Sequence, residues 1–251
     1  MSGHSHWSTI KRKKGAADAK RGQLFTRLAR EIVIAARDGG GDPETNIRLQ
    51  FAIDRAKSQN MPKDNIERAI KRGTGELKDG LVMEEIYYEG YAPHSIALII
   101  LCVTDNRNRS VSEVRHVLNR MGGTMADLGS VAWQFNRSSY FSFPLADHDA
   151  DEIFELAVES GADDVVFDGG LVEIIGEVEV FKEISDRLKA NSIVPEEAEL
   201  RMIPNTELNI GKEETLQVFR VIEALEDLED VQDVYSNLGL SEEMVTILEK
   251  A

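Results

Sequence analysis

The residues best suited to chemistry are cations near the start of the chain. The run Lys11-Arg12-Lys13-Lys14 is followed closely by the pair Lys20-Arg21. Closely spaced Lys and Arg side chains attract phosphates through charge and counterion release, without contacting any base. The cluster therefore predicts contact with a nucleic-acid backbone. The simpler alternative is a basic tail that is only solvated.

The positive charge extends beyond this cluster. Residues 1–75 contain sixteen Lys and Arg against eight Asp and Glu, a net charge of +8. Residues 76–251 contain 13 basic and 37 acidic residues, a net charge of −24, so the whole chain carries −16. Such an asymmetry indicates a basic segment that binds a polyanion and an acidic remainder that repels bulk nucleic acid.

Two other sets of residues are weaker candidates. His4 and His6 form an H-x-H pair, but a metal site needs more ligands than these, and Cys102 is distant in an apolar strand. Arg107 and Arg109 follow a strand and precede a helix, whose N-terminal N–H groups suit an anion. We treat this pair as a candidate anion site, with an ordinary loop that carries solvated arginines as the equal alternative.

No catalytic or cofactor-binding set is evident. The acidic run from Glu223 to Asp233 follows the polar face of a helix, where a solvated surface is the simplest interpretation. Cys102 lies within the apolar strand IALIILCV, which predicts a buried structural thiol. Walker-type and dinucleotide glycine patterns are missing from the sequence. We therefore expect a protein that is not an enzyme and needs no cofactor or metal.

Three short helices must position the basic residues. Apolar residues at helical spacing predict helices from Asp18 to the glycines at 39–41, from Asp42-Pro43 onward, and from Met61-Pro62 to Gly73. Arg48, Arg55, Arg68, Lys71 and Arg72 fall outside the apolar stripes. We therefore expect them to face solvent or a polyanion.

The acidic remainder predicts two α+β domains. A hairpin turns around Ala92-Pro93-His94, Ser110 and Glu113 form a capping box that begins a helix, and Gly129 to Phe135 is strand-like. Residues 139–204 then follow the ferredoxin-like order βαββαβ. We predict a basic helical domain at 1–79, a second domain formed by 80–136 and 207–251, and a third at 137–206 inserted in the second.

Several motifs together resemble one family. They are GHSHWSTIKRKKGAADAKRGQLFTRLAREI, GGGDPETNIRL, MPKDNIERAIKRGTG, YYEGYAP, TDNRNRSVSEVRHVL, GGTMADLGSVAWQF and EDLEDVQDVYSN. This combination is similar to the YebC/PmpR family, a relative of the mitochondrial translational activator of cytochrome c oxidase. The resemblance implies three domains, with the third inserted in the second. His6 and Ala92 stand where the family usually has Lys and Gly.

The resemblance implies a DNA-binding transcriptional regulator or, alternatively, a ribosome-associated factor that contacts rRNA and aids elongation through proline runs. A protein-interaction adaptor that uses its acidic domains is the weaker alternative. We expect a cytoplasmic protein with no membrane and no small-molecule substrate. The residues predicted to bind nucleic acid are Lys11, Arg12, Lys13, Lys14, Lys20, Arg21, Arg27, Arg30, Lys71 and Arg72.

Overall fold

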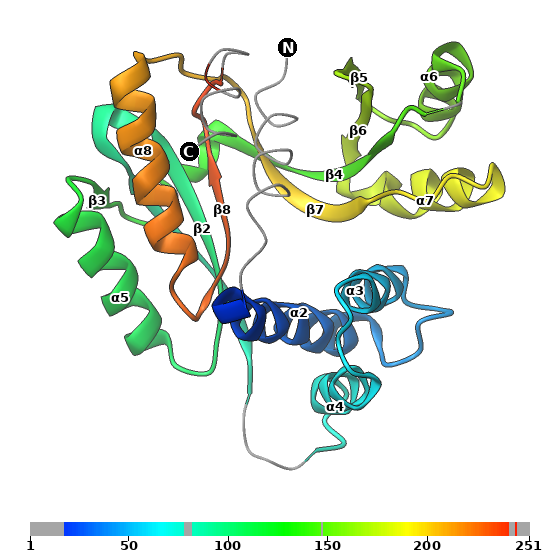
Figure 1. Ribbon diagram of the computed structural model, residues 1–251, viewed down its shortest axis with the longest axis horizontal. Helices are drawn as coiled ribbons and strands as arrows, with labels where there is room; N and C mark the ends of the chain where they lie inside the picture. The colour runs from blue at the N-terminus through cyan, green and yellow to red at the C-terminus, as the bar shows by residue number, and fades with distance from the viewer. Residues whose placement is uncertain (1–17, 78–81, 147, 241–243, 245–251) are drawn as a thin grey trace. The chain divides into compact units, whose positions relative to one another are not determined.

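The structure is a computed structural model that describes residues 18–77, 82–146, 148–240 and Met244 (Figure 1). These residues form two compact units. Of the described residues, the first unit contains those from Asp18 to Ala132 and from Gly211 to Ser236, and the second contains those from Trp133 to Ile210 and those after 236. The second unit therefore interrupts the first in sequence. The predicted boundaries of three domains stay a prediction.

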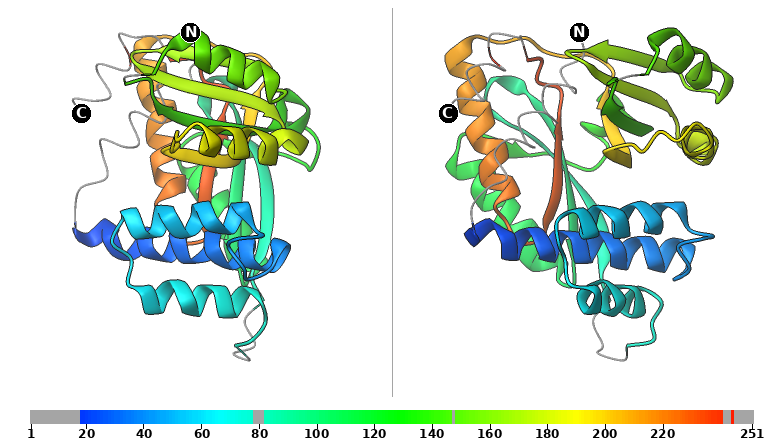
Figure 2. Two further views of the ribbon diagram at one scale, coloured as in Figure 1. Left: turned by 90° about the vertical axis from the view of Figure 1, so that its right-hand side faces the viewer. Right: turned by 45° about the vertical axis from the view of Figure 1, so that its right-hand side comes forward.

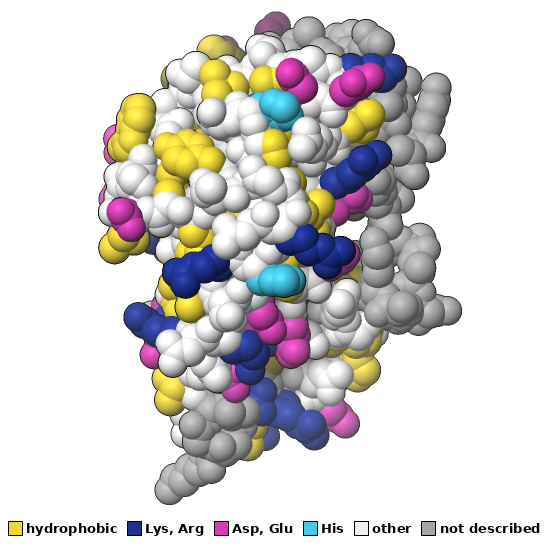
Figure 3. Space-filling view, turned by 90° about the vertical axis from the view of Figure 1, so that its left-hand side faces the viewer, with side chains coloured by type: hydrophobic (Ala, Val, Ile, Leu, Met, Phe, Trp, Pro, Cys, Tyr) yellow, Lys and Arg dark blue, Asp and Glu magenta, His cyan; other side chains and the backbone are white. Residues whose placement is uncertain are grey.

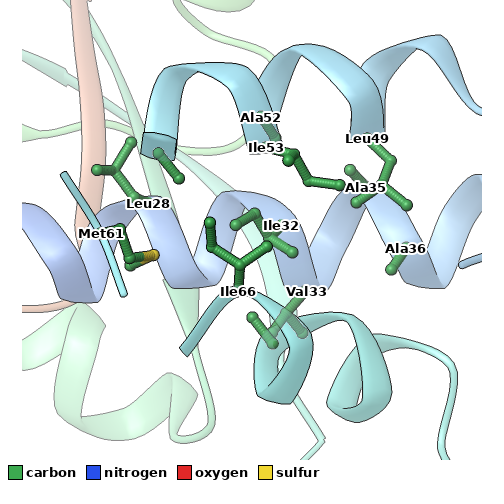
Figure 4. Packing of buried hydrophobic residues seen from close by; sticks show 12 residues of the cluster. Leu28, Ile32, Val33, Ala35, Ala36, Leu49, Ala52, Ile53, Met61 and Ile66 are labelled. Carbon is green, nitrogen blue, oxygen red and sulfur yellow. The ribbon is translucent and has the colours of Figure 1, made fainter. Parts of the chain in front are cut away.

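Three helices open the first unit, α2 (Asp18–Gly39), α3 (Ile47–Ser58) and α4 (Lys63–Gly73). Their apolar stripes meet in one core, in which Ile32 and Leu49 are completely buried. Figure 4 shows these side chains between the helices, with Ile66 of α4 turned toward α2. Such packing stabilises short helices that would be marginal alone. A Cβ atom at Gly73 would collide with the carbonyl oxygen of Val33, so this glycine lets α4 end against α2.

The second helix begins later than the sequence predicted. Asn46, and not Asp42, is the N-cap of α3, and its side-chain oxygen accepts a hydrogen bond from the Leu49 N–H at 3.1 Å. Its side-chain nitrogen donates to the carbonyl oxygens of Ala35 and Gly40, both at 2.8 Å. Asn46 therefore fixes the connection between α2 and α3. The sequence did not predict this cap because the two carbonyl oxygens that hold the Asn46 side chain belong to α2 and to the residue that follows it.

A four-stranded antiparallel sheet completes the first unit. Its strands are β1 (Glu84–Tyr91), β2 (Ala97–Thr104), β3 (Thr124–Met125) and β8 (Val231–Ser236), in the order β3-β1-β2-β8. Every residue of β2 is buried, which confirms the central strand expected from its apolar sequence. Helices α5 (Arg107–Arg120) and α8 (Lys212–Glu226) pack together beside this sheet (Figure 1).

Two sequence predictions in this part of the chain are wrong. Helix α5 begins at Arg107 because Asn106 caps it, so Ser110 lies inside the helix and is not its cap. The segment predicted as a strand at Gly129 to Phe135 is a turn followed by a short 3₁₀ helix, Ala132–Gln134. The strand begins only at Phe135, because the buried carboxylate of Glu89 accepts hydrogen bonds from the N–H groups of Gly129, Val131 and Ala132.

The second unit has the predicted βαββαβ order. Its elements are β4 (Phe135–Pro144), α6 (Ala150–Glu159), β5 (Asp164–Asp168), β6 (Leu171–Glu177), α7 (Phe181–Ala190) and β7 (Glu197–Pro204). The strands lie in the order β5-β6-β4-β7, all antiparallel, which is the ferredoxin-like arrangement. Figure 2 shows α6 and α7 on one face of this sheet. The α+β fold class is thus confirmed.

Candidate nucleic-acid interface

Helix α4 presents cations on the side opposite its core contacts. Ile66 and Ala69 are buried against the other helices, so the 3.6-residue period places Arg68 and Lys71 toward solvent. No ion pair involves either side chain among the described residues. Two uncompensated cations three positions apart on one helix are suited to contact a phosphate backbone.

Other exposed cations of the helical part are paired with nearby carboxylates. Lys57 Nζ lies 3.2 Å from Asp54 Oδ1, and Lys63 Nζ lies 3.5 Å from Glu67 Oε1. Exposed pairs of this kind contribute little to stability, but each carboxylate cancels the field of its partner at short range. Lys57 and Lys63 therefore offer less to a phosphate than Arg68 and Lys71 do.

The Arg48 side chain is held by two carboxylates of the protein. Its guanidinium bridges Asp38 Oδ2 at 3.2 Å and Glu85 Oε2 at 3.1 Å, and so links α3 to β1. Burial opposes the charged form, but the two carboxylates outweigh it and raise the pKa of Arg48 above its ordinary value. The expectation that Arg48 faces a polyanion is therefore not supported. Arg55 likewise lies 3.5 Å from Glu31.

The structure describes only part of the predicted binding set. Lys11, Arg12, Lys13 and Lys14 lie outside the described residues. Lys20 and Arg21 belong to α2, in which Arg27 is half-buried, and Lys71 and Arg72 lie in the last turn of α4. Helices α2 and α4 pack against each other, so the fold brings these two groups of cations onto neighbouring elements.

Arg30 was predicted to bind nucleic acid, but the structure places it in the interior. Its side chain is 7% exposed and donates from Nη2 to Asp230 Oδ1 at 3.1 Å and to Glu229 Oε1 at 3.2 Å. Nη1 also donates to the carbonyl oxygen of Glu229. A guanidinium enclosed in this way cannot reach a phosphate, so Arg30 does not belong to a binding surface.

The candidate anion site at Arg107 and Arg109 is also not formed. Asn106 already accepts the N–H of Arg109, which removes a donor from the N-terminus of α5. The Arg107 side chain pairs with Glu84. Arg109 turns to Asp230, with Nη2 2.8 Å from Oδ1 and Nε 3.0 Å from Oδ2. Both arginines are paired with carboxylates of the protein, although the Arg107 side chain remains 69% exposed to solvent and that of Arg109 remains 39% exposed.

Asp230 is the residue that sequence reasoning missed. Its side chain is 1% exposed, and it receives Arg30, Arg109 and the Thr104 hydroxyl, whose oxygen lies 2.9 Å from Oδ2. The acidic run in which it lies predicts a solvated face, an interpretation that holds for the exposed residues Asp227 and Glu229. The only sequence signal is its position directly before the apolar strand β8. Its partners are too distant in sequence to identify.

Other chemistry has little support in the described residues. They contain no group of three or more His, Cys, Asp or Glu that could hold a metal ion. None of their helices is long and apolar enough to cross a membrane. Cys102 is completely buried, as predicted, and burial raises its pKa to about 12. On the face shown in Figure 3, Lys and Arg side chains lie among Asp and Glu rather than in a continuous field.

Comparison with known proteins covers nearly the whole chain. Residues 5–76 match the family model described as the TACO1/YebC protein N-terminal domain, and residues 83–238 match the TACO1/YebC second and third domain. A protein of Geotalea uraniireducens is 49% identical over 97% of this chain and 98% of its own length. One of Borrelia turicatae is 50% identical over 97% of this chain and 100% of its own. Both are named probable transcriptional regulatory proteins.

The fold also matches a solved structure. A conserved hypothetical protein of Aquifex aeolicus superimposes with a TM-score of 0.82 at 42% sequence identity. The match covers 91% of this chain and 94% of the other. At this identity and coverage the two chains share one architecture.

Proposed function

Because this chain belongs to the TACO1/YebC family, we propose that it is a DNA-binding transcriptional regulator without catalytic activity, whose basic N-terminal helices contact the phosphate backbone. The observation that carries this proposal is the charge division, with +8 in residues 1–75 and −24 in the remainder. The role in transcription is proposed from the names of the relatives. The contact with DNA is proposed from the positive charge of residues 1–75.

The proposed contact surface differs from the predicted nucleic-acid-binding set by the loss of one residue and the gain of another. It retains Lys11, Arg12, Lys13, Lys14, Lys20, Arg21, Arg27, Lys71 and Arg72 and gains Arg68, which is exposed on α4 beside Lys71. Arg30 is removed, and Arg107 and Arg109, the separate candidate anion site, are not added, because each is paired with carboxylates of the first unit. The sequence contains no evident helix-turn-helix, zinc-finger or RNP-type pattern, so we expect contacts to phosphates to dominate.

The test is the salt dependence of binding to duplex DNA. Changing Lys11, Arg12, Lys13 and Lys14 together to Gln should weaken binding and reduce the slope of log affinity against log salt by about 0.9 for each lost phosphate contact. The control changes Lys57 and Lys63, two cations that already pair with carboxylates, and its loss of slope for each removed charge should be smaller. An unchanged slope in the fourfold variant would refute the proposed contact of these residues with the phosphate backbone.

The nature of the nucleic acid needs a separate measurement. Crosslinking in cells, followed by sequencing of the bound DNA and RNA in parallel, should recover promoter DNA. Predominant recovery of rRNA, with co-sedimentation with ribosomes that survives DNase, would overturn the transcriptional assignment. That result would leave the basic surface in place and change its ligand to RNA.

A further inference from the structure

Helix α6 in the second unit has an unusual surface for a helix of an ordinary domain. Its buried side is formed by Ile153 and Ala157. Each exposed position is occupied either by a carboxylate or by an apolar residue, and the helix contains no Lys or Arg. The exposed residues are Asp151, Glu152, Phe154, Glu155, Val158 and Glu159.

The two apolar residues form a stripe. Phe154 and Val158 are one helical turn apart, so they lie on the same side of α6, and they are 52% and 55% exposed. Single exposed apolar residues are common on proteins, so the observation of interest is that an aromatic and an aliphatic residue adjoin on an otherwise charged helix. Solvation alone gives no reason for apolar residues at both positions.

The neighbouring strand carries a further exposed apolar residue on the same face of the sheet as α6. Helix α6 packs against β5, which is the edge strand of its sheet. Phe167 of β5 is opposite Val172 of β6, on the same face of the sheet as Phe141, whose ring contacts Phe181 at the start of α7. Phe167 is therefore on the helix-covered face, yet it remains 39% exposed. We call Phe154, Val158 and Phe167, with Asp151 and Glu155, the α6 patch.

The charge around the α6 patch is almost entirely negative. Residues 137–206 contain seventeen Asp and Glu against five Lys and Arg, a net charge of −12. Glu159 pairs with Arg187 at 2.7 Å, whereas Asp151, Glu152 and Glu155 form no ion pair among the described residues. Of these, Asp151 and Glu155 lie beside Phe154 and Val158 on the helix surface and remain available to a partner. A surface of this charge repels nucleic acid and other acidic surfaces.

We propose that the α6 patch is a docking site for a basic amphipathic helix of another protein. Large apolar side chains of that helix would cover Phe154, Val158 and Phe167, while its Lys and Arg residues would face Asp151 and Glu155. This combination of apolar anchors and complementary charge is a known mode of helix recognition. The site gives the second unit a role of its own, separate from the contact of the first unit with nucleic acid.

The test uses synthetic peptides and the full chain. Three labelled peptides of equal length are compared by fluorescence anisotropy: an amphipathic Leu/Lys helix, its Leu/Glu counterpart and a Ser/Lys peptide without apolar residues. We expect the Leu/Lys peptide to bind and the other two to bind at least tenfold more weakly. Equal binding of the Leu/Glu or Ser/Lys peptide would overturn the proposal, because it requires both charge and apolar contact.

Variants then locate the site. The double substitution Phe154→Ser and Val158→Ser should weaken Leu/Lys binding at least tenfold, and Glu155→Gln should weaken it less and reduce its salt dependence. Leu128→Ser is the matched control, because Leu128 is 89% exposed but lies in the first unit. Equal affinity of the double variant and the control would refute the site, provided that both melt at the wild-type temperature.

A second copy of this chain is the competing occupant. Sedimentation equilibrium should show the same mass for the wild type and the double variant. A wild-type dimer that becomes a monomer on Phe154→Ser and Val158→Ser would reassign the patch to self-association. Neither result depends on DNA binding by the first unit, so the two proposals fail separately.

Discussion

Arg30 and Asp230 are 200 residues apart in sequence, and their side chains pair in the interior with Nη2 3.1 Å from Oδ1. Asp230 also receives Arg109 and Thr104, so one carboxylate joins α2, α5 and the end of β2. A buried charge group is tolerated only where its partners surround it. This group therefore couples the basic helices to the first sheet.

Removal of the Asp230 charge should destabilise the first unit. The change Asp230→Asn leaves Arg30 buried without a full counter-charge, and we expect the free energy of unfolding to fall by about 3–5 kcal/mol. Urea denaturation followed by circular dichroism measures the change. Glu229→Gln is the control, because this side chain is 72% exposed, and it should change stability by less than about 1 kcal/mol. Similar losses in the two variants would contradict the central role of Asp230.

Glu89 should make stability depend on pH. Burial opposes its charged form, but hydrogen bonds from the N–H groups of Gly129, Val131 and Ala132 outweigh burial and lower its pKa. A carboxyl whose folded pKa is below its unfolded pKa stabilises the protein above the unfolded value. That stabilisation is lost as pH falls through the folded value. The wild type should therefore lose stability in acid below about pH 4.

The change Glu89→Gln isolates this effect. The variant should be about 1–3 kcal/mol less stable than the wild type at neutral pH, because a neutral acceptor replaces a charged one. The difference should shrink as the pH is lowered. Denaturation curves recorded between about pH 3 and pH 7, at intervals of about half a pH unit, measure this difference in stability. Glu44→Gln, at an exposed position, should follow the wild-type curve; a constant difference at all pH values would argue against titration of Glu89.

Cys102 should resist alkylation in the folded protein. Its side chain is completely buried, and burial, followed by the charge of Asp230, raises its pKa to about 12. The reactive thiolate is therefore scarce at neutral pH, and the reagent has no access to it. Mass spectrometry after iodoacetamide treatment should find the thiol unmodified in buffer and modified in urea. Rapid modification in buffer would show that the β2 strand opens readily.

The exposed pair on α4 should contribute to DNA affinity. The double change Arg68→Gln and Lys71→Gln should reduce the slope of log affinity against log salt by about 1.8, twice the value for one contact. Lys57→Gln with Lys63→Gln removes the same charge from positions that carry carboxylate partners, and it should have a smaller effect. Fluorescence anisotropy over a range of salt concentrations compares them. Equal slopes for the two variants would show that binding responds only to net charge.

The sequence by itself determined the helices and strands wherever local pattern is sufficient. The apolar stripe of Ile66 and Ala69, the fully apolar strand that contains Cys102 and the βαββαβ order all follow from periodicity, which depends only on neighbouring residues. The motifs also determined the family, and the excess of cations before residue 76 indicated the basic end. The starts of α3 and α5 were predicted wrongly because Asp42 and Ser110 also have the side chains of N-cap residues. The residues that cap these helices are Asn46 and Asn106.

Only the tertiary structure decided which charges are available to a ligand. Arg30 and Arg68 are alike in sequence, yet one is enclosed by Asp230 and Glu229 and the other faces solvent. Likewise Asp230 is buried while Glu155 is exposed, although both belong to acidic runs. The physical reason is that burial and pairing depend on residues brought together from distant parts of the chain, and a charge acts on a ligand only when no such partner neutralises it.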